Sequence, residues 1–317
     1  MQSYLHYLRK SGHPVSTSID RLWKYDVTLE SVQELVSKIR MKGLRIIYSL
    51  DDNYFDLAFK ENTFPTRKIL PIVSYLLSQA DAVSVTTSAL RQRLLTFNPN
   101  ISVIPNQLDE RLLVLRYPTG LVKPIEPDRV VVGYMGTFTH DADLKMVLPA
   151  IKTIHQRFPG RLEFQIVGVV NMEDTKQELQ QLPVKYVYPL PEEHEYPLFM
   201  LWFTGHMHWD IAISPLQNTP FNACKSDIKF LDYASIGAAG IFSQSPAYSS
   251  TVQHQQNGWL TENTIEAWEE ALETLLLQPE LRLSIARNAY RYLFTERLLA
   301  QRATDWVELI KSVVIHS

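Results

Sequence analysis

Short apolar runs alternate with longer amphipathic stretches along most of the chain. Three such runs in the first third are rich in β-branched residues and end in polar or turn residues, namely 45–50, 82–87 and 101–106. This pattern predicts buried strands, and the stretches between them at 67–80 and 88–97 have the spacing of helices. Strands that alternate with helices predict a parallel sheet with helices on both faces.

Residues 117–129 interrupt the alternation, because they contain three prolines and a glycine without any periodicity. We predict a linker here. The alternation then resumes with strands predicted at 130–136, 162–168, 184–189, 209–215 and 240–245. Helices are predicted between them at 141–157, 173–181, 195–203, 226–236 and 264–276. The last stretch, 279–316, is predicted to be helical in two pieces that pack back across other helices.

Two tandem Rossmann-like α/β domains follow from this pattern, a short one at 1–120 and another at 130–317. A chain of 317 residues is long for a single domain and suits two. We read 21–31 as a degenerate strand region of the first domain. Ligands of open parallel sheets bind beyond the carboxyl ends of the strands, so candidate chemistry is sought there.

Composition removes several classes of function. The net charge of −3 and the lack of a basic cluster argue against a nucleic-acid partner. The single cysteine, Cys224, excludes an internal disulfide framework and a Cys-rich metal site. No apolar run approaches the ~18 residues of a membrane span, and the N-terminus lacks the apolar core of a secretory signal. We therefore expect a cytoplasmic protein.

The turn after the predicted strand 130–136 is the first candidate site. It contains Gly136, Thr137, Thr139 and His140. Glycine lets a ligand approach the backbone closely, and Thr139 or Asp141 could cap the helix that follows. The start of a helix favours a phosphate, although a plain strand-to-helix turn explains the same residues.

The segment after the predicted strand 209–215 is the second candidate. Lys225 and Lys229 lie four residues apart beside a predicted helix start, with Ser226 as the expected N-cap. Two ammonium groups at a helix start suit a diphosphate. Asp232 could then reach sugar hydroxyls, whereas the alternative is an exposed ion pair between Lys229 and Asp232.

Acidic residues follow the predicted strand 45–50 as well. Asp51, Asp52 and Asn53 could bind a metal, act as a base or hold hydroxyls, or they could form a turn and helix cap. His206 and His208 are two apart and could share a metal on an extended segment, but a third ligand is not evident. We predict no metal site.

Several of these segments resemble one family of enzymes. VVVGYMGTFTHDADLKMVLPAIKTI (130–154) resembles the first strand, turn and helix of the donor domain in GT-B glycosyltransferases of the retaining family 4. DIAISPLQNTPFNACKSDIKFLDYASIGAAGIFS (210–243) resembles the donor-site segment of that family. RIIYSLDDNYF (45–55) resembles an Asp-Asp segment of a subset that makes bacterial surface polysaccharides.

The resemblance implies transfer of a sugar, with retention, from a nucleotide diphosphate-sugar to a glycan or lipid-linked acceptor. It implies no metal and no cofactor besides that co-substrate. Asp51, Asp52 and Lys229 would be catalytic, with Asp51 or Asp52 orienting the acceptor and Lys229 facing the leaving diphosphate. The donor-binding residues would be Gly136, Thr137, Thr139, His140, Asn222, Lys225, Ser226, Lys229 and Asp232, with Asp232 as the ribose-binding acid.

Two departures from the family keep other functions open. The family has two glutamates spaced eight apart, whereas Cys224 stands at the earlier position and Asp232 at the later one, so Asn222 or Lys225 would have to substitute. The domain before the linker is also short. A non-catalytic binding module or one half of a complex, and a nucleotide-sugar epimerase, are the alternatives. Peripheral membrane contact and a partner subunit stay open.

Overall fold

The structure is a computed structural model that describes residues 27–57, 66–114, 129–168 and 170–314. Contacts divide the chain into two units. The first unit extends to Asn106 and includes the segments 223–226 and 302 onwards, and the second comprises 107–222 and 227–301. Most of the predicted linker at 117–129 lies outside the described residues.

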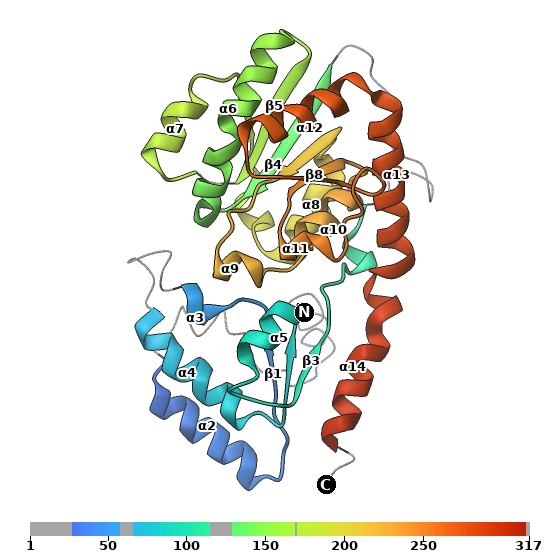
Figure 1. The fold of residues 1–317 in the computed structure, drawn as a ribbon. Coiled ribbons are helices and arrows are strands. Elements are labelled where there is room, and N and C mark those ends of the chain that lie inside the picture. Colours follow the sequence, from blue (N-terminus) through green and yellow to red (C-terminus); the bar gives the residue numbers. More distant parts are fainter. Residues whose placement is uncertain (1–26, 58–65, 115–128, 169, 315–317) are drawn as a thin grey trace. The chain divides into compact units, whose positions relative to one another are not determined.

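The first unit contains a three-stranded parallel sheet in the order β1-β2-β3 (Figure 1). The strands are β1 (Ile47–Leu50), β2 (Ala82–Val85) and β3 (Ile101–Val103). The helices are α2 (Leu29–Met41), α3 (Tyr54–Leu57), α4 (Thr66–Gln79) and α5 (Ser88–Leu94). Alternate residues of β2 face opposite sides, as the period of a strand requires. Val83 and Val85 pack with Leu77 of α4 and Leu90 of α5.

The degenerate strand predicted at 21–31 is wrong for its described part. Residues from Leu29 onwards form α2, and Thr28 caps it, because its side chain accepts a hydrogen bond from the Ser31 N–H at 3.2 Å. Val32 and Val36, four residues apart, are the buried positions of α2, so the helical period explains its apolar residues.

The second unit contains a six-stranded, wholly parallel sheet in the order β6-β5-β4-β7-β8-β9. Its strands are β4 (Val130–Gly136), β5 (Leu162–Gly168), β6 (Val184–Val187), β7 (Ile211–Ser214), β8 (Ala239–Ser243) and β9 (Trp259–Thr261). The helices are α6 (Asp141–Arg157), α7 (Glu173–Leu179), α8 (Tyr196–His206), α9 (Pro220–Ala223), α10 (Ile228–Ser235), α11 (Pro246–Ser249), α12 (Ile265–Leu277) and α13 (Pro279–Glu296). All five strands predicted in this half of the chain are present. The three-residue strand β9 was not among the ranges predicted from the sequence.

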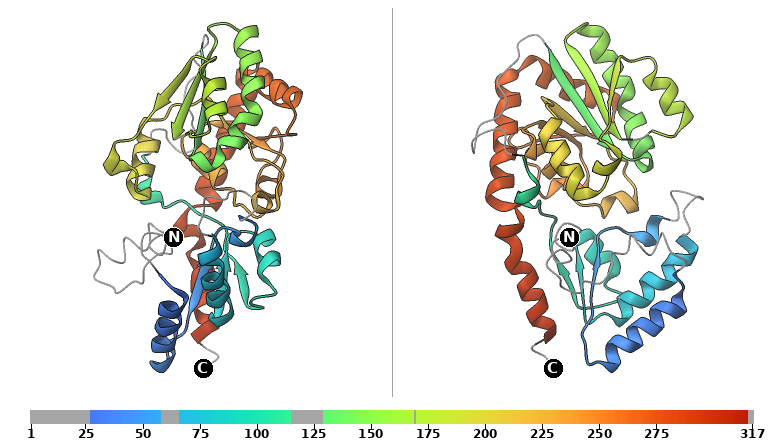
Figure 2. Two further views of the ribbon diagram at one scale, coloured as in Figure 1. Left: turned by 90° about the vertical axis from the view of Figure 1, so that its left-hand side faces the viewer. Right: turned by 180° about the vertical axis from the view of Figure 1, so that it is seen from behind.

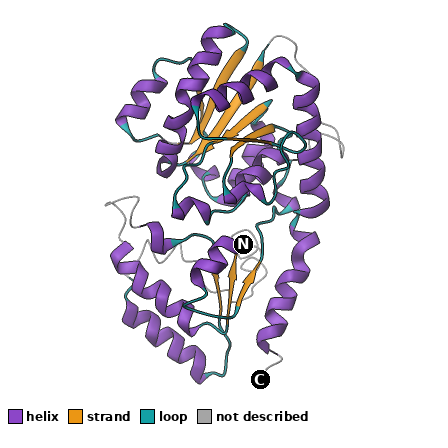
Figure 3. Ribbon diagram, viewed as in Figure 1, coloured by secondary structure: helices purple, strands orange, loops and turns teal. Residues whose placement is uncertain are grey.

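Helices cover both faces of this sheet (Figures 2 and 3). On one face, Val132 of β4 packs in a core with Leu144 of α6 and Trp268 of α12. On the other face, Ala212 of β7 packs in a second core with Phe203 of α8 and Phe230 of α10. No helix in the described ranges is long and apolar enough to cross a bilayer.

The end of the chain belongs to the first unit, whereas the prediction placed it in the second domain at 130–317. Helix α13 ends at Glu296 and α14 (Leu299–Val314) follows after a break, which matches the two predicted pieces. From residue 302 onwards α14 belongs to the first unit. There Leu309 and Val313 pack against Ala82 and Ile104, on the face of the sheet opposite to α4 and α5.

A buried ion pair fixes the start of α10. Arg297 donates to both oxygens of Asp227, at 2.7 and 2.9 Å, and the two side chains are 7% and 9% exposed. Thr251 donates a further hydrogen bond to Asp227 at 2.6 Å. The pair therefore links the residue before α10 to the residue after α13 and to the loop after α11.

Replacing Asp227 with asparagine should destabilise the second unit by about 3–5 kcal/mol, because it leaves the buried guanidinium without its counter-charge. Chemical denaturation measures the loss. Glu273→Gln is the control, because Glu273 pairs with the half-exposed Arg157 at 2.6 Å and should cost less than about 1 kcal/mol. Equal losses in the two variants would contradict the structural role of the buried pair.

Candidate functional site

The order of the six-stranded sheet reverses between β4 and β7. Strands β5 and β6 lie on one side of β4, and the later strands β7, β8 and β9 lie on the other. Ligands of open parallel sheets bind beyond the carboxyl ends of the strands at such a point. Gly136 and Ser214 are the last residues of the two strands that flank it.

The turn after β4 is closely packed against its neighbours. A Cβ on Gly136 would lie 2.3 Å from the Tyr134 hydroxyl, and a Cβ on Gly168 would lie 1.7 Å from the Gly136 carbonyl oxygen. Gly168, whose φ is +127°, therefore requires glycine, and a side chain at Gly136 would have to displace the Tyr134 ring. The Thr137 and Thr139 hydroxyls are 2.9 Å apart and hydrogen-bonded. Two hydroxyl groups thus lie together just beyond the end of β4.

The N-cap of α6 differs from the prediction. Neither Thr139 nor Asp141 caps the helix; the N-cap is His140, and its side chain makes no cap hydrogen bond. The positive end of a 17-residue helix lies directly after the turn, and it favours an anion.

Two buried carboxylates in the first turn of α6 tie the neighbouring loops together. Asp141 accepts hydrogen bonds from the backbone N–H groups of Asn171 and Met172, at 2.5 and 2.7 Å. Asp143 accepts from the backbone N–H of Gln217 at 2.9 Å and bonds the His140 ring at 2.8 Å. The loops after β4, β5 and β7 are thereby held to one helix start.

Asp143 was not predicted from the sequence. Acids in the first turn of a helix are common, so its type and position carry little signal. The spacing of His140 and Asp143, three residues apart across a helix start, was the one available indication.

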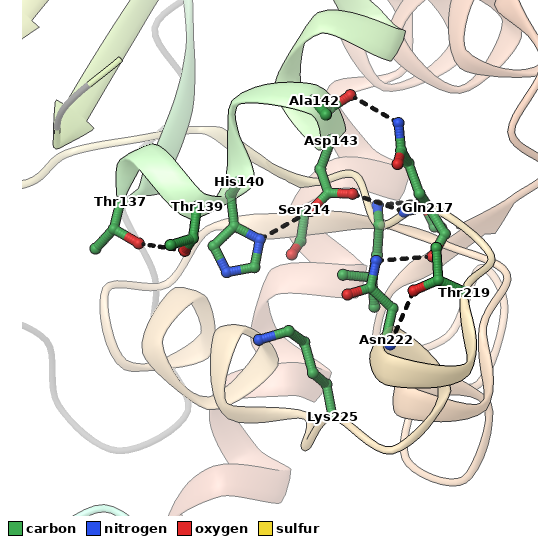
Figure 4. Close-up of polar contacts among 12 residues, drawn as sticks. Thr137, Thr139, His140, Ala142, Asp143, Ser214, Gln217, Thr219, Asn222 and Lys225 are labelled. Carbon is green, nitrogen blue, oxygen red and sulfur yellow. Dashed lines mark hydrogen bonds and ion pairs between the residues drawn. The ribbon is translucent and has the colours of Figure 1, made fainter. Parts of the chain in front are cut away.

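The loop after β7 joins the same cluster (Figure 4). Asn222 is fully buried, and its side-chain N–H donates to the Gln217 carbonyl at 2.8 Å. Its backbone N–H donates to the Thr219 hydroxyl at 3.1 Å. The Oδ1 atom of Asn222 is buried without a hydrogen-bond partner in the described part of the chain. Gly136, Thr137, Thr139, His140 and Asn222 thus gather around the ends of β4 and β7.

Asp232 lies on α10 and is 4% exposed. Its Oδ1 atom is buried, and no group among the residues that the structure describes hydrogen-bonds it. Burial raises the pKa of Asp232 to about 6, although the nearby Lys229 ammonium acts in the opposite direction. The alternative of an exposed Lys229–Asp232 ion pair is wrong, because the carboxylate is inside the protein.

The remaining predicted site residues lie in the first unit, to which 223–226 belongs. Lys225 Nζ lies 3.7 Å from Asp52 Oδ1, and the two side chains are 21% and 42% exposed. Asp51, at the end of β1, is exposed. Ser226 is not the N-cap of α10, which begins at Ile228; its hydroxyl instead accepts from the Asn106 side chain at 2.8 Å.

Cys224 is buried in the core of the first unit. The Asn53 side chain donates to its sulfur at 3.4 Å, and the Thr87 hydroxyl donates to its carbonyl at 2.9 Å. Burial raises the pKa of the thiol. Cys224 therefore contributes to the packing of the first unit.

The two candidate metal-binding histidines do not form a site. His206 is the last residue of α8, so the extended segment assumed for it is wrong, and its ring bonds the Trp202 carbonyl at 2.9 Å. Across the described ranges, no group of three or more histidine, cysteine, aspartate or glutamate side chains is arranged to hold a metal ion.

Asp232→Asn should stabilise the protein at neutral pH. The ordinary carboxyl pKa of 3.8 rises to about 6 on folding, so the folded state binds the proton more tightly than the unfolded state. The carboxyl then favours folding most at low pH, and this advantage disappears as the pH rises through about 6. Asparagine should add about 1–3 kcal/mol at about pH 7.5 and nothing at about pH 4, as measured by urea denaturation.

Asp109→Asn is the matched control in the same unit. Burial tends to raise the pKa of Asp109, but its hydrogen bonds with Arg111 outweigh burial and lower the pKa overall. This variant should lose stability at about pH 7.5. A loss of stability in Asp232→Asn as well would contradict the unfavourable burial of its carboxylate.

No protein-family model matches the sequence, and no curated protein matches it. Solved structures do match. HepE of Anabaena, solved in complex with UDP and glucose, is 14% identical over 90% of this chain and 76% of its own, with a TM-score of 0.65.

Two further structures give the same result. A glycosyltransferase from Rickettsia africae is 13% identical over 99% of this chain and 88% of its own, with a TM-score of 0.63. Sucrose-phosphate synthase from Thermosynechococcus elongatus is 14% identical over 100% of this chain and 77% of its own, also with a TM-score of 0.63. The chain therefore has the GT-B fold that the sequence predicted.

Proposed function

We propose that this chain transfers a sugar from a UDP-sugar to a hydroxyl of a glycan or lipid-linked acceptor, in the synthesis of a surface polysaccharide. The fold supports a nucleotide-sugar transferase. UDP is chosen as the nucleotide because the similar HepE has been solved with UDP and with UDP-glucose.

The unsatisfied carboxylate of Asp232 is the observation that carries this proposal. A buried acceptor without a partner is costly, so a ligand that supplies donors to it gains binding energy. The 2′ and 3′ hydroxyls of a ribose supply two donors that would satisfy it. Because burial raises the pKa of Asp232 to about 6, the carboxylate is ionised and able to accept both hydroxyls at neutral pH.

Positive groups would hold the diphosphate. Lys229 lies on the same helix as Asp232, three residues earlier, and its charge acts on that carboxylate. The start of α6, with the Thr137 and Thr139 hydroxyls beside it, offers further donors. The unpaired Oδ1 of the buried Asn222 could accept a sugar hydroxyl.

In the proposed reaction, the bond between the anomeric carbon and the phosphate oxygen breaks, and the acceptor oxygen bonds to that carbon with retention. The acceptor proton leaves with the departing UDP or an adjacent carboxylate. Lys225, Lys229 and the helix starts neutralise the diphosphate without a metal or another cofactor. Asp51 or Asp52 orients the acceptor hydroxyl.

One observation favours a second candidate, a module that binds nucleotide without transferring sugar. Cys224 occupies the position at which the family has an acid, and it is 6% exposed in the core of the first unit. Its buried thiol therefore cannot act in place of that carboxylate. Nucleotide binding without turnover on any acceptor would support this candidate.

UDP should stabilise the protein against heat more than GDP, TDP or ADP does. A nucleotide at about 100 times its dissociation constant adds about 2.7 kcal/mol. Lys229→Ala and Asp232→Ala should each weaken UDP binding at least about 10-fold, measured by calorimetry. Lys145→Ala is the control, because Lys145 pairs with Asp174 on the exposed surface. Unchanged UDP affinity in both site variants would contradict the donor site.

The double variant Asp51→Ala/Asp52→Ala should reduce transfer about 100-fold or more, if these carboxylates orient the acceptor. UDP affinity should change by less than about 5-fold, because the partly exposed Asp52–Lys225 pair is worth less than about 1 kcal/mol. Initial rates at varied acceptor concentration separate the loss of transfer from any loss of UDP affinity. Lys225→Ala is the comparison, because it should weaken UDP binding itself. Normal transfer by the double variant would exclude this role.

A further inference from the structure

His140 and Asp143 form a contact between a partly exposed imidazole ring and a buried carboxylate. Asp143 is fully buried in the first turn of α6, and one of its oxygens lies 2.8 Å from the Nδ1 atom of His140. The other oxygen accepts the Gln217 backbone N–H at 2.9 Å. His140 is partly exposed, with 23% of its side chain accessible. A buried carboxylate thus holds an accessible imidazole.

The geometry indicates which ring nitrogen is the donor. An ionised carboxylate can only accept, so Nδ1 donates this hydrogen bond, and Nε2 lies on the side of the ring turned away from Asp143 (Figure 4). A carboxylate without exposed surface is costly unless it is paired with a positive charge. An imidazolium supplies that charge, and its Nε2–H then becomes a charged donor.

We infer that Asp143 is a positioning residue that keeps His140 as an imidazolium, with Nε2–H directed at an oxygen of the donor diphosphate. This inference rests on the proposed function and adds the positive charge of His140 to the proposed donor site. Of the groups that could bind Nε2–H, an anion fits best. The ring belongs to the turn that carries Thr137 and Thr139, at the positive end of α6.

Three titratable groups near the pair are neutral or are engaged with other partners. The Tyr134 hydroxyl donates to the His140 carbonyl at 3.4 Å. Burial, and to a smaller extent the charge of Asp143, raises the pKa of Tyr134 and of Tyr248, so both phenols stay neutral. Asp141 is occupied by the backbone N–H groups of Asn171 and Met172.

Nitrogen NMR of the full-length, ¹⁵N-labelled protein tests the charge directly. His140→Gln identifies the His140 signals among those of the nine histidines. At neutral pH the wild type should show both His140 ring nitrogens protonated, and Asp143→Asn should show a neutral ring. Asp141→Asn is the matched control: it removes an equally buried carboxylate from the same helical turn, and the imidazolium should persist.

UDP affinity tests the consequence. Asp143→Asn and His140→Gln should each weaken UDP binding by about 10-fold, the loss of one charge-assisted hydrogen bond. The double variant should bind no more weakly than the weaker single variant, because the two residues act as one unit. Asp141→Asn should bind UDP as the wild type does.

The outcomes separate the two proposals. A neutral His140 ring in the wild type, or an imidazolium that survives Asp143→Asn, overturns the positioning role even if UDP binds. Additive losses of UDP affinity, or an equal loss in Asp141→Asn, reduce Asp143 to a structural residue and overturn it as well. If the wild type binds no UDP while its NMR spectrum shows the Asp143-dependent imidazolium, the donor proposal fails and only the charge pair stands.

Discussion

The buried ion pair of Asp227 and Arg297 sets the place where α10 begins, and Lys229 and Asp232, the two residues of α10 in the proposed donor site, take their positions from it. Asp227 is the last residue before α10, so Lys229 and Asp232 follow at fixed points of the first turns. A helix start held only by its own backbone would fray. Two charged hydrogen bonds and the Thr251 hydroxyl hold it instead.

Four of the buried carboxylates in the second unit fall into two groups with different consequences. Asp141, Asp143 and Asp227 each accept at least two hydrogen bonds and hold loops or helices in place. Asp232 is just as buried, yet one of its oxygens has no described partner. The first group stabilises the fold, and the last destabilises it at neutral pH. A side chain that is retained although it lowers the stability of the fold is typical of a binding site.

Much of the fold could be predicted from the sequence, because each strand and helix of the second unit buries one face and its apolar residues therefore recur with a regular period. Helix α6 follows the predicted range because Leu144, Val147 and Ile151 repeat with the helical period. Helix α2 was missed although its buried residues Val32 and Val36 repeat with the helical period, because the strand region predicted at 21–31 overlapped its start. Asp143 was missed because its partner Gln217 is 74 residues away, and periodicity carries no signal for such contacts.

Sequence spacing alone also could not show whether Lys225 and Lys229 lie on the same face of one helix. Four residues place two side chains on one face only if both belong to the same helix, and α10 begins after Lys225. The backbone of 223–226 instead serves the first unit, where Lys225 lies beside Asp52. Lys229 is therefore the cation that α10 itself carries beside Asp232. The charge of Lys225 is already partly balanced by Asp52, whereas Lys229 acts on the buried carboxylate of Asp232.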